Sequence, residues 1–415
     1  MSEPDARRER RTFGVRVSVL FAAIFVVAGT NLPYLPVWLD WKGLGPHEIA
    51  VITATPLFIR VLVTPAIAFA ADRAGDHRRF LIVLSWCGLA ALLALSQSSG
   101  FWPILMCTAV FALAWTTIMP LTETVALSGV KAAGLDYGRM RLWGSLSFIA
   151  ASLCGGWVVG QYGAASAVWL VVGGGVLTTV AAHTLARPIG LGRLKAVTSP
   201  PRLRIADAVG LLYSRLFLTF LLAAGATQAA HAMFYTFGTL HWASQGLSAD
   251  WLGTLWAIGV IAEIAVFTFS AGVVRRFGAA ELIAIAGAAA VVCWLAMGFD
   301  PPLAGLVALQ ALHGLTFGAA HVGAIHFMAK AVPEMQTGTS QALYASVTGG
   351  IAMGGAMLAA GPLYATYAGQ GYWAMAAIAA IGLAASLALP RGQRGTAESR
   401  QPQSRDEGGC SNAPS

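Results

Sequence analysis

The chain alternates between long apolar runs and short polar segments. Each run approaches the roughly 20 residues that an α-helix needs to cross a bilayer. None alternates with the period of two that a membrane-spanning strand requires, and lipid admits only helices or closed barrels, because backbone polar groups must be paired. The pattern predicts an all-α membrane protein with twelve transmembrane helices, at residues 15–39, 49–71, 80–95, 101–127, 142–159, 165–185, 211–239, 251–274, 282–299, 303–329, 340–364 and 372–389.

Composition narrows the class of protein. Of the 415 residues, 57% are hydrophobic and 11% are charged, whereas a soluble domain carries about 25% charged residues. A soluble protein of this size cannot hide so much apolar surface from water. The sequence therefore excludes a soluble enzyme, a nucleic-acid-binding protein and a disordered chain. The five cysteines have no paired spacing, so we expect neither a disulfide framework nor a metal site.

Basic residues set the expected orientation. Of the 26 Lys and Arg residues, all but Lys42 and Arg60 fall near the chain ends or near the loops on one side of a twelve-helix bundle. Cytoplasmic loops carry the excess of Lys and Arg. We therefore expect a multi-pass protein of the inner (plasma) membrane with both termini in the cytoplasm.

The same pattern divides the chain into five segments. A basic, Pro-interrupted stretch at 187–207 is interpreted as a cytoplasmic linker between two six-helix halves, 15–186 and 208–389. Residues 1–14 are expected to form a cytoplasmic tail that is retained before the first span. Residues 390–415, rich in Gly, Ser, Gln and Arg, are expected to be a disordered cytoplasmic tail.

A weak internal repeat relates the two halves. A shift of 203 residues superimposes Gly43-Leu44 on Gly246-Leu247, and it places Arg60 on Glu263. Two halves related by an axis along the membrane normal produce such a pattern. We expect Arg60 and Glu263 at matching depth on opposite sides of a central cavity. A charge there costs at least ~2.5–3.5 kcal/mol, so each either lines a substrate and ion path or forms a permanent ion pair between the halves.

Several segments resemble a known family. The loop FAADRAGDHRR at 69–79, preceded by Ala68 where the family has Gly, is similar to the helix 2–3 loop of the major facilitator superfamily. The segments LDYGRMRLWGS, QAAHAMFY, LWAIGVIAEIAVF and LHGLTFGAAH resemble its 3-phenylpropionic acid transporter branch, near the oligosaccharide:proton symporters. The resemblance implies two pseudo-symmetric six-helix halves, a proton-coupled importer and a central cavity lined by helices 1, 7 and 11.

Polar residues within the apolar runs are the candidates for function. A guanidinium matches a carboxylate bidentately, which makes Arg60 a candidate for binding an organic acid. On the helices that line the cavity in this family, the candidates for substrate contact are Asn31, Tyr34, Gln228, His231, Gln341 and Tyr344.

Other polar residues are candidates for proton coupling and gating. Glu263 is expected to carry the proton, assisted by His313 and His321, which share one face of helix 10. For each histidine, a hydrogen bond to a neighbouring helix is an equally good interpretation. Glu123 is expected to form a gating salt bridge with Arg139 and Arg141, with proton carriage as the alternative role. Conformational contacts are assigned to Asp72 and Arg73.

Among functions, secondary transport fits the sequence best. No Lys follows a glycine, so a phosphate-binding loop for ATP cannot be written. HExxH and GxSxG motifs are also absent, which argues against an intramembrane enzyme. We expect a monomeric carrier without a cofactor, whose partners are a small molecule, protons and the bilayer. The family resemblance implies 3-phenylpropionate or a related aromatic carboxylate as the substrate. A proton-driven drug exporter and a nucleoside or sugar importer are the alternatives.

Overall fold

The structure, a computed structural model, describes residues 3–185, 205–333 and 336–390. Most of the predicted linker and almost all of the predicted C-terminal tail lie outside these ranges. The first half begins with a helix that reaches back to Glu3, well before the predicted start of the first span. Its elements are α1 (Glu3–Trp41), α2 (Pro46–Ala74), α3 (His77–Gln97), α4 (Phe101–Ala133), α5 (Tyr137–Tyr162), the short turn η1 (Ala164–Ser166) and α6 (Ala167–Thr184).

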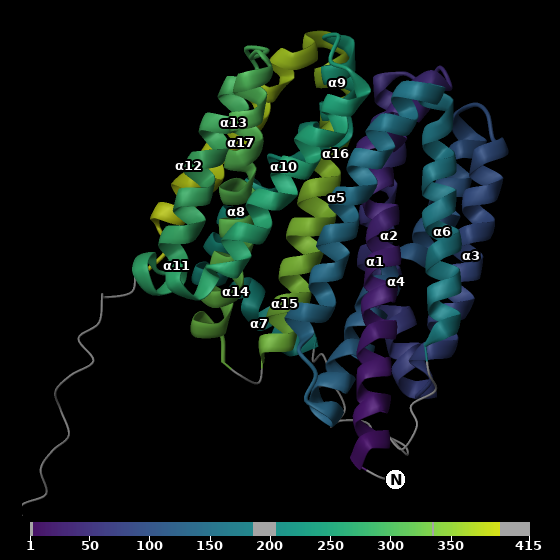
Figure 1. The fold of residues 1–415 in the computed structure, drawn as a ribbon. Coiled ribbons are helices and arrows are strands. Elements are labelled where there is room, and N and C mark those ends of the chain that lie inside the picture. Colours follow the sequence, from purple (N-terminus) through teal and green to yellow (C-terminus); the bar gives the residue numbers. More distant parts are fainter. Residues whose placement is uncertain (1–2, 186–204, 334–335, 391–415) are drawn as a thin grey trace, which may run out of the picture.

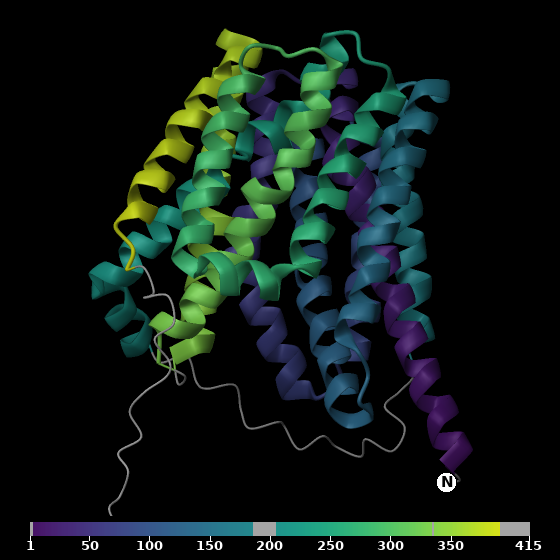
Figure 2. The same cartoon turned by 60° about the vertical axis from the view of Figure 1, so that its left-hand side comes forward.

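The second half has the same plan but more interruptions. Its elements are α7 (Ile205–Tyr213), α8 (Arg215–Ala229), α9 (Ala232–Ser244), α10 (Ala249–Thr268), α11 (Ser270–Phe277), α12 (Ala279–Met297), α13 (Leu303–His313), η2 (Gly314–Ala319), α14 (Ala320–Ala331), α15 (Thr337–Ser346), η4 (Val347–Ala352), α16 (Met353–Tyr367), η5 (Ala368–Gly371) and α17 (Tyr372–Leu387). Figures 1 and 2 show the two halves as neighbouring groups of long helices.

The predicted twelve helices are confirmed. Eleven helical segments among the described residues are long and apolar enough to cross a membrane. The last, Thr337–Leu387, has 51 residues, more than twice what one span needs. It contains two helices that part at η5, where Ala368 has φ 45°: α16 packs on α2, whereas α17 packs on α8 and α12.

Two predicted spans need correction. Residues 251–274 do not form one span, because α10 ends at Thr268 and the separate helix α11 follows with no buried residue. Arg139 and Arg141 are not in a loop, because α5 already begins at Tyr137. The Asp136 side chain accepts a hydrogen bond from the Arg139 backbone N–H, and such a cap satisfies an otherwise unpaired helix donor.

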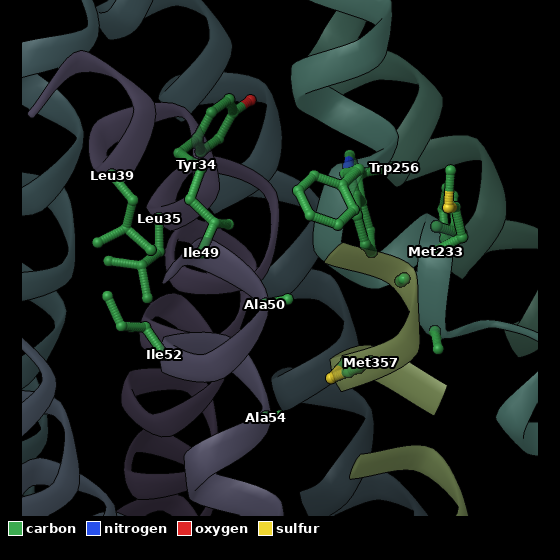
Figure 3. Close-up of a cluster of buried hydrophobic side chains, with 14 of the residues drawn as sticks. Tyr34, Leu35, Leu39, Ile49, Ala50, Ile52, Ala54, Met233, Trp256 and Met357 are labelled. Carbon is green, nitrogen blue, oxygen red and sulfur yellow. The ribbon is translucent and has the colours of Figure 1, made fainter. Parts of the chain in front are cut away.

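Hydrophobic packing differs between the two ends of the bundle. We call the end that carries Arg73, Arg78, Arg139, Arg275 and Arg276 the basic side, and the other end the far side. On the far side, one buried cluster includes side chains from both halves. In Figure 3, Tyr34, Leu35 and Ile49 of α1 and α2 lie beside Trp256 and Met357 of α10 and α16.

On the basic side the hydrophobic core is divided. One cluster, which includes Phe21 and Ile118, belongs to the first half, and separate clusters, which include Phe220 and Ala320, belong to the second. Among the described residues, no buried cluster joins the halves there. The two halves are therefore packed together on the far side and separated on the basic side.

Glycines bring the halves together on the far side. A Cβ atom at Gly156 of α5 would lie 2.5 Å from the Ala249 carbonyl oxygen of α10, and one at Gly253 of α10 would overlap the Ser152 carbonyl oxygen of α5. On the other side of the interface, Gly354 and Gly361 of α16 face α2 in the same way. Small residues permit such close backbone approach within membranes.

Candidate functional site

The site is built around a close approach of α10 and α13. A Cβ at Gly314, directly after α13, would lie 2.7 Å from the Ala262 carbonyl of α10, and one at Gly259 would lie 3.3 Å from the Gln310 side-chain oxygen. Because both glycines lack a side chain, the helices meet at the level of Glu263 and His313. His313 Nε2 lies 3.4 Å from Glu263 Oε1, with 6% and 19% of the two side chains exposed. We call this pair the dyad.

A line of polar atoms continues from the dyad into the protein. Thr316 Oγ1 lies 3.3 Å from His313 Nδ1 and 3.0 Å from His231 Nε2. His231, which is completely buried, places its Nδ1 3.0 Å from the Thr227 carbonyl oxygen and 3.2 Å from that of Gln228. The four side chains Glu263, His313, Thr316 and His231 all belong to the second half.

The backbone at Thr316 explains how the line forms. Residues Gly314–Ala319 make a π-helical turn between α13 and α14. Such a turn adds a residue to the helix and rotates the residues after it, and it often occurs at functional sites. Here it buries Thr316 between the two histidine rings, whose centroids are 5.2 Å apart.

Aromatic side chains surround the dyad. Tyr235 stacks on Trp256, with ring centroids 6.1 Å apart. Phe317 lies between His313 and His321, with centroid distances of 6.1 and 6.2 Å. These rings give the second half a largely apolar wall that contains few polar groups, as is usual for a small-molecule site.

The first half contributes two arginines with a glutamate that interacts with both of them. Glu123 of α4 accepts a hydrogen bond from the Tyr137 hydroxyl at 3.4 Å, and it interacts electrostatically with Arg60 of α2 and with Arg141 of α5. The Arg141 guanidinium lies 4.0 Å from the centroid of the Phe25 ring. Arg141 interacts with Glu123 and, across the space between the halves, with Glu263.

Of the two alternatives for Arg60 and Glu263, the permanent ion pair between the halves is not formed in this conformation. Within the described part of the chain, no ion pair joins them. The carboxylate that interacts electrostatically with Arg60 is Glu123, and the arginine that interacts with Glu263 is Arg141. The 203-residue shift compares sequence positions along α2 and α10. It contains no information on the direction in which a side chain leaves each helix.

The remaining predicted substrate residues are scattered. Tyr34 is completely buried and donates its hydroxyl to the Ser152 carbonyl oxygen at 2.5 Å, so it packs helices together in this conformation. Gln228 and Tyr344 are buried, Asn31 is half-buried and Gln341 is exposed. The structure brings His231 to the dyad but not Asn31, Tyr34 or Gln341.

The predicted gating residues divide into two groups. Asp72 pairs with His77 at 2.8 Å, and Arg139 pairs with Asp136 at 3.5 Å. Asp72, Arg73, Asp136 and Arg139 are exposed on the basic side and His77 is half-buried there, away from Glu123. Of the two arginines expected to pair with Glu123, the structure places only Arg141 near it.

Sequence reasoning missed Thr316. Its spacing of three residues from His313 would have been a usable signal, because residues three apart on a helix lie close together. It also missed the far-side contact of His241 with Asp300, whose Nε2 and Oδ1 atoms are 2.8 Å apart.

Two packed helical halves with charged residues between them are the arrangement on which many secondary transporters are built. Comparison with known proteins gives the family. A model of the MFS_1 like family matches residues 15–375, and the chain belongs to this family of the major facilitator superfamily. It is a transporter, not an enzyme.

Individual relatives are more distant. The chain is 31% identical over 368 residues, 86% of its length and 92% of the relative's, to the "Probable 3-phenylpropionic acid transporter" of Escherichia coli strain K12. It is 29% identical to the maltose permease of Geobacillus stearothermophilus, over 80% of this chain and 83% of the permease. The crystal structure of the nucleoside transporter NupG superimposes with a TM-score of 0.79 at 17% identity, covering 91% of this chain and 98% of NupG.

Proposed function

We propose that the protein takes up a small aromatic or short-chain monocarboxylate together with a proton, by alternating access. The observation that carries this proposal is that two kinds of group lie in different halves. The first half has the Arg60 guanidinium, which forms no ion pair with another described residue, and the second half has the carboxylate–imidazole pair of Glu263 and His313. The relative with 31% identity, named for 3-phenylpropionic acid, supports the substrate class.

Arg60 is proposed to bind the substrate carboxylate. Arg60 is exposed, and it forms no ion pair with any residue in the described ranges. A charge in the middle of a transmembrane helix is costly unless water or a ligand satisfies it. A bidentate contact with a carboxylate satisfies a guanidinium especially well. The aromatic residues of the opposite half would then pack against an apolar substrate body.

The line of charges suggests how substrate and proton are coupled. In the structure, Glu123 interacts with both Arg60 and Arg141, and Arg141 also interacts with Glu263. A substrate carboxylate at Arg60 would release Glu123 from that arginine. Glu123 would then attract Arg141 more strongly and withdraw positive charge from Glu263. The dyad would compensate by binding a proton, so that anion and proton enter together.

We also propose an orientation and an assembly state. The basic side is taken as cytoplasmic, because Lys and Arg are enriched in cytoplasmic loops, and the separation of the halves there makes this conformation inward-facing. The protein is proposed to work as a monomer, since both halves of the site belong to one chain.

Uptake into proteoliposomes tests the proposal. Glu263→Gln should abolish accumulation of labelled 3-phenylpropionate driven by a pH gradient, yet retain exchange between internal and external substrate. Arg60→Lys should reduce uptake by about tenfold or more, the effect of losing a bidentate contact worth roughly 1.5–3 kcal/mol. Glu281→Gln and Arg215→Lys, which change the same residue types outside the site, are the matched controls.

Two results would contradict the proposal. Concentrative, pH-driven uptake by Glu263→Gln would remove the coupling role of Glu263. Uptake of labelled maltose, with carboxylates neither transported nor competing, would favour a sugar importer, the second candidate. The 29% identity to a maltose permease is the observation in its favour.

A further inference from the structure

Hydrogen-bond directions along the polar line are fixed from its buried end. His231 Nδ1 faces two backbone carbonyl oxygens, of Thr227 and Gln228, and carbonyl oxygens only accept hydrogen bonds. His231 Nδ1 must therefore carry a proton. The ring is completely buried, and no carboxylate of the described residues forms an ion pair with it. His231 is therefore neutral, and its Nε2 atom is an acceptor.

The next step sets the hydroxyl of Thr316. This hydroxyl lies 3.0 Å from His231 Nε2 and has one proton to donate. Donation to Nε2 satisfies the lone pair of that nitrogen. If the proton instead pointed to the His313 carbonyl oxygen, which is 3.1 Å away, two lone pairs would face each other in a buried site. Thr316 Oγ1 is therefore free only as an acceptor toward His313.

The final step concerns His313 itself. Its Nδ1 atom lies 3.3 Å from the accepting Thr316 oxygen, so Nδ1 carries the proton. In neutral His313 the Nε2 atom is then bare and faces Glu263 Oε1 at 3.4 Å. A bare nitrogen opposite an ionised carboxylate is unfavourable, because both groups are acceptors. One proton between them, on either atom, makes a hydrogen bond.

We propose that Thr316 and His231 are positioning residues that lock His313 in its Nδ1–H tautomer, so that the dyad retains one exchangeable proton. This inference deepens the proposed function and rests on it for its biological role. Without the lock, neutral His313 could turn to its Nε2–H tautomer and donate to ionised Glu263. That hydrogen bond would stabilise the dyad after it has lost its exchangeable proton.

Other groups near the dyad do not replace this lock. Arg141 of α5 and His321 of α14 interact electrostatically with Glu263, as does Tyr235 of α9. Among the described residues, the polar atom within hydrogen-bond distance of His313 Nδ1 is the Thr316 hydroxyl. These neighbours affect the charge of the dyad, whereas Thr316 determines the tautomer.

Solid-state nitrogen-15 NMR of the reconstituted full-length protein tests the lock, because the chemical shift of each imidazole nitrogen shows whether it is protonated. The protein has eight histidines, and His313→Gln and His231→Gln identify the two sets of signals. We expect Nδ1–H signals from both residues in the wild type. In Thr316→Val, which keeps the shape but loses the hydroxyl, His313 should show Nε2–H signals above neutral pH.

The same spectra give a titration. Thr316→Val should lower the pH at which the dyad releases its proton by about one to two units, the shift that corresponds to one hydrogen bond to a charged group. Thr316→Ser should restore the wild-type titration and tautomer. Thr178→Val is the matched control, because Thr178 is also completely buried but donates its hydroxyl to its own helix, at the Gly174 carbonyl oxygen.

The outcomes separate this inference from the proposed function. Nδ1–H signals from His313 in Thr316→Val, with an unchanged titration, would overturn the lock. So would a wild-type His313 in the Nε2–H tautomer. If the tautomer changes as expected but uptake of carboxylates does not respond to a proton gradient, the lock stands and the transport proposal fails.

Discussion

Gly253 is the position where one methyl group should open the far side. A Cβ atom there would overlap the Ser152 carbonyl oxygen and lie 2.6 Å from the Tyr34 hydroxyl oxygen. Those two oxygens are the partners of the hydrogen bond that ties α1 to α5. Gly253→Ala therefore inserts a methyl group into a packed interface between the halves and pushes α10 away from α5.

The magnitude is the sum of two contributions. Overpacking of a well-packed site costs about 1–3 kcal/mol, and loss of the Tyr34–Ser152 hydrogen bond costs about 0.5–1.5 kcal/mol. Together they destabilise the far-side-closed conformation by about 1.5–4.5 kcal/mol, which is a shift of about 10- to 2,000-fold in its equilibrium with a far-side-open conformation. The second conformation lacks the close contact of α5 with α10 and is not penalised.

Cysteine labelling on the opposite interface measures this shift. Ala50 of α2 is 1% exposed and lies against Gly361 of α16, away from the substitution. In a background without native cysteines, Ala50→Cys should react with a membrane-impermeant maleimide at least tenfold faster in the Gly253→Ala protein. Right-side-out and inverted vesicles identify the side from which the reagent enters.

A matched glycine provides the control. A Cβ at Gly173 of α6 would have no neighbour within 4 Å, so Gly173→Ala should leave the labelling rate unchanged. If Gly253→Ala also leaves it unchanged at equal expression, the far-side glycine contacts do not hold the halves closed, and our interpretation of the interface is wrong.

Two further substitutions test particular contacts. Gly314→Ala places a Cβ 2.7 Å from the Ala262 carbonyl, so it should separate α13 from α10, lower stability by about 1–3 kcal/mol and abolish pH-driven uptake while substrate exchange continues; retained pH-driven uptake would contradict this. Asp300 has φ 51° and contacts the nearly buried His241, so Asp300→Ala should lower the thermal unfolding midpoint. The cost is about 1.5–3 kcal/mol for the lost hydrogen bond to a carboxylate, since only the neutral Gln245 amide then remains near His241 Nε2, at 3.1 Å. Asp300→Asn, which tolerates this backbone conformation and keeps a side-chain oxygen, should lie close to the wild type in the same melt.

The spans were predictable because lipid imposes length and apolarity on each helix. The end of α10 at Thr268 was not, since the residues of α11 include the apolar Val273 and Val274 and continue the run. Hydropathy shows how apolar a segment is, but it does not show whether the segment forms one straight helix or two separate ones.

The site was predictable in its members more than in its contacts. Glu263 and His313 were both candidates, and their contact depends on Gly259 and Gly314, which allow two helices to approach. Of the two glycine pairs in the eleventh span, at 349–350 and 354–355, Gly350 and Gly354 face α2. Gly349 and Gly355 have no neighbour within 4 Å of a Cβ, because a helix turns successive residues to different sides.

The location of the dyad within one half has a thermodynamic consequence. Glu263, His313, Thr316 and His231 move together if each half moves as a rigid body, so their mutual distances are the same in every conformation. Arg141 belongs to the other half, and its distance from Glu263 changes with the angle between the halves. Linkage is reciprocal. If the approach of Arg141 changes the proton affinity of the dyad by some factor, then protonation of the dyad changes the equilibrium between the conformations by the same factor. One coupling free energy therefore describes both effects: how the angle between the halves changes the proton affinity of the dyad, and how protonation of the dyad changes that angle.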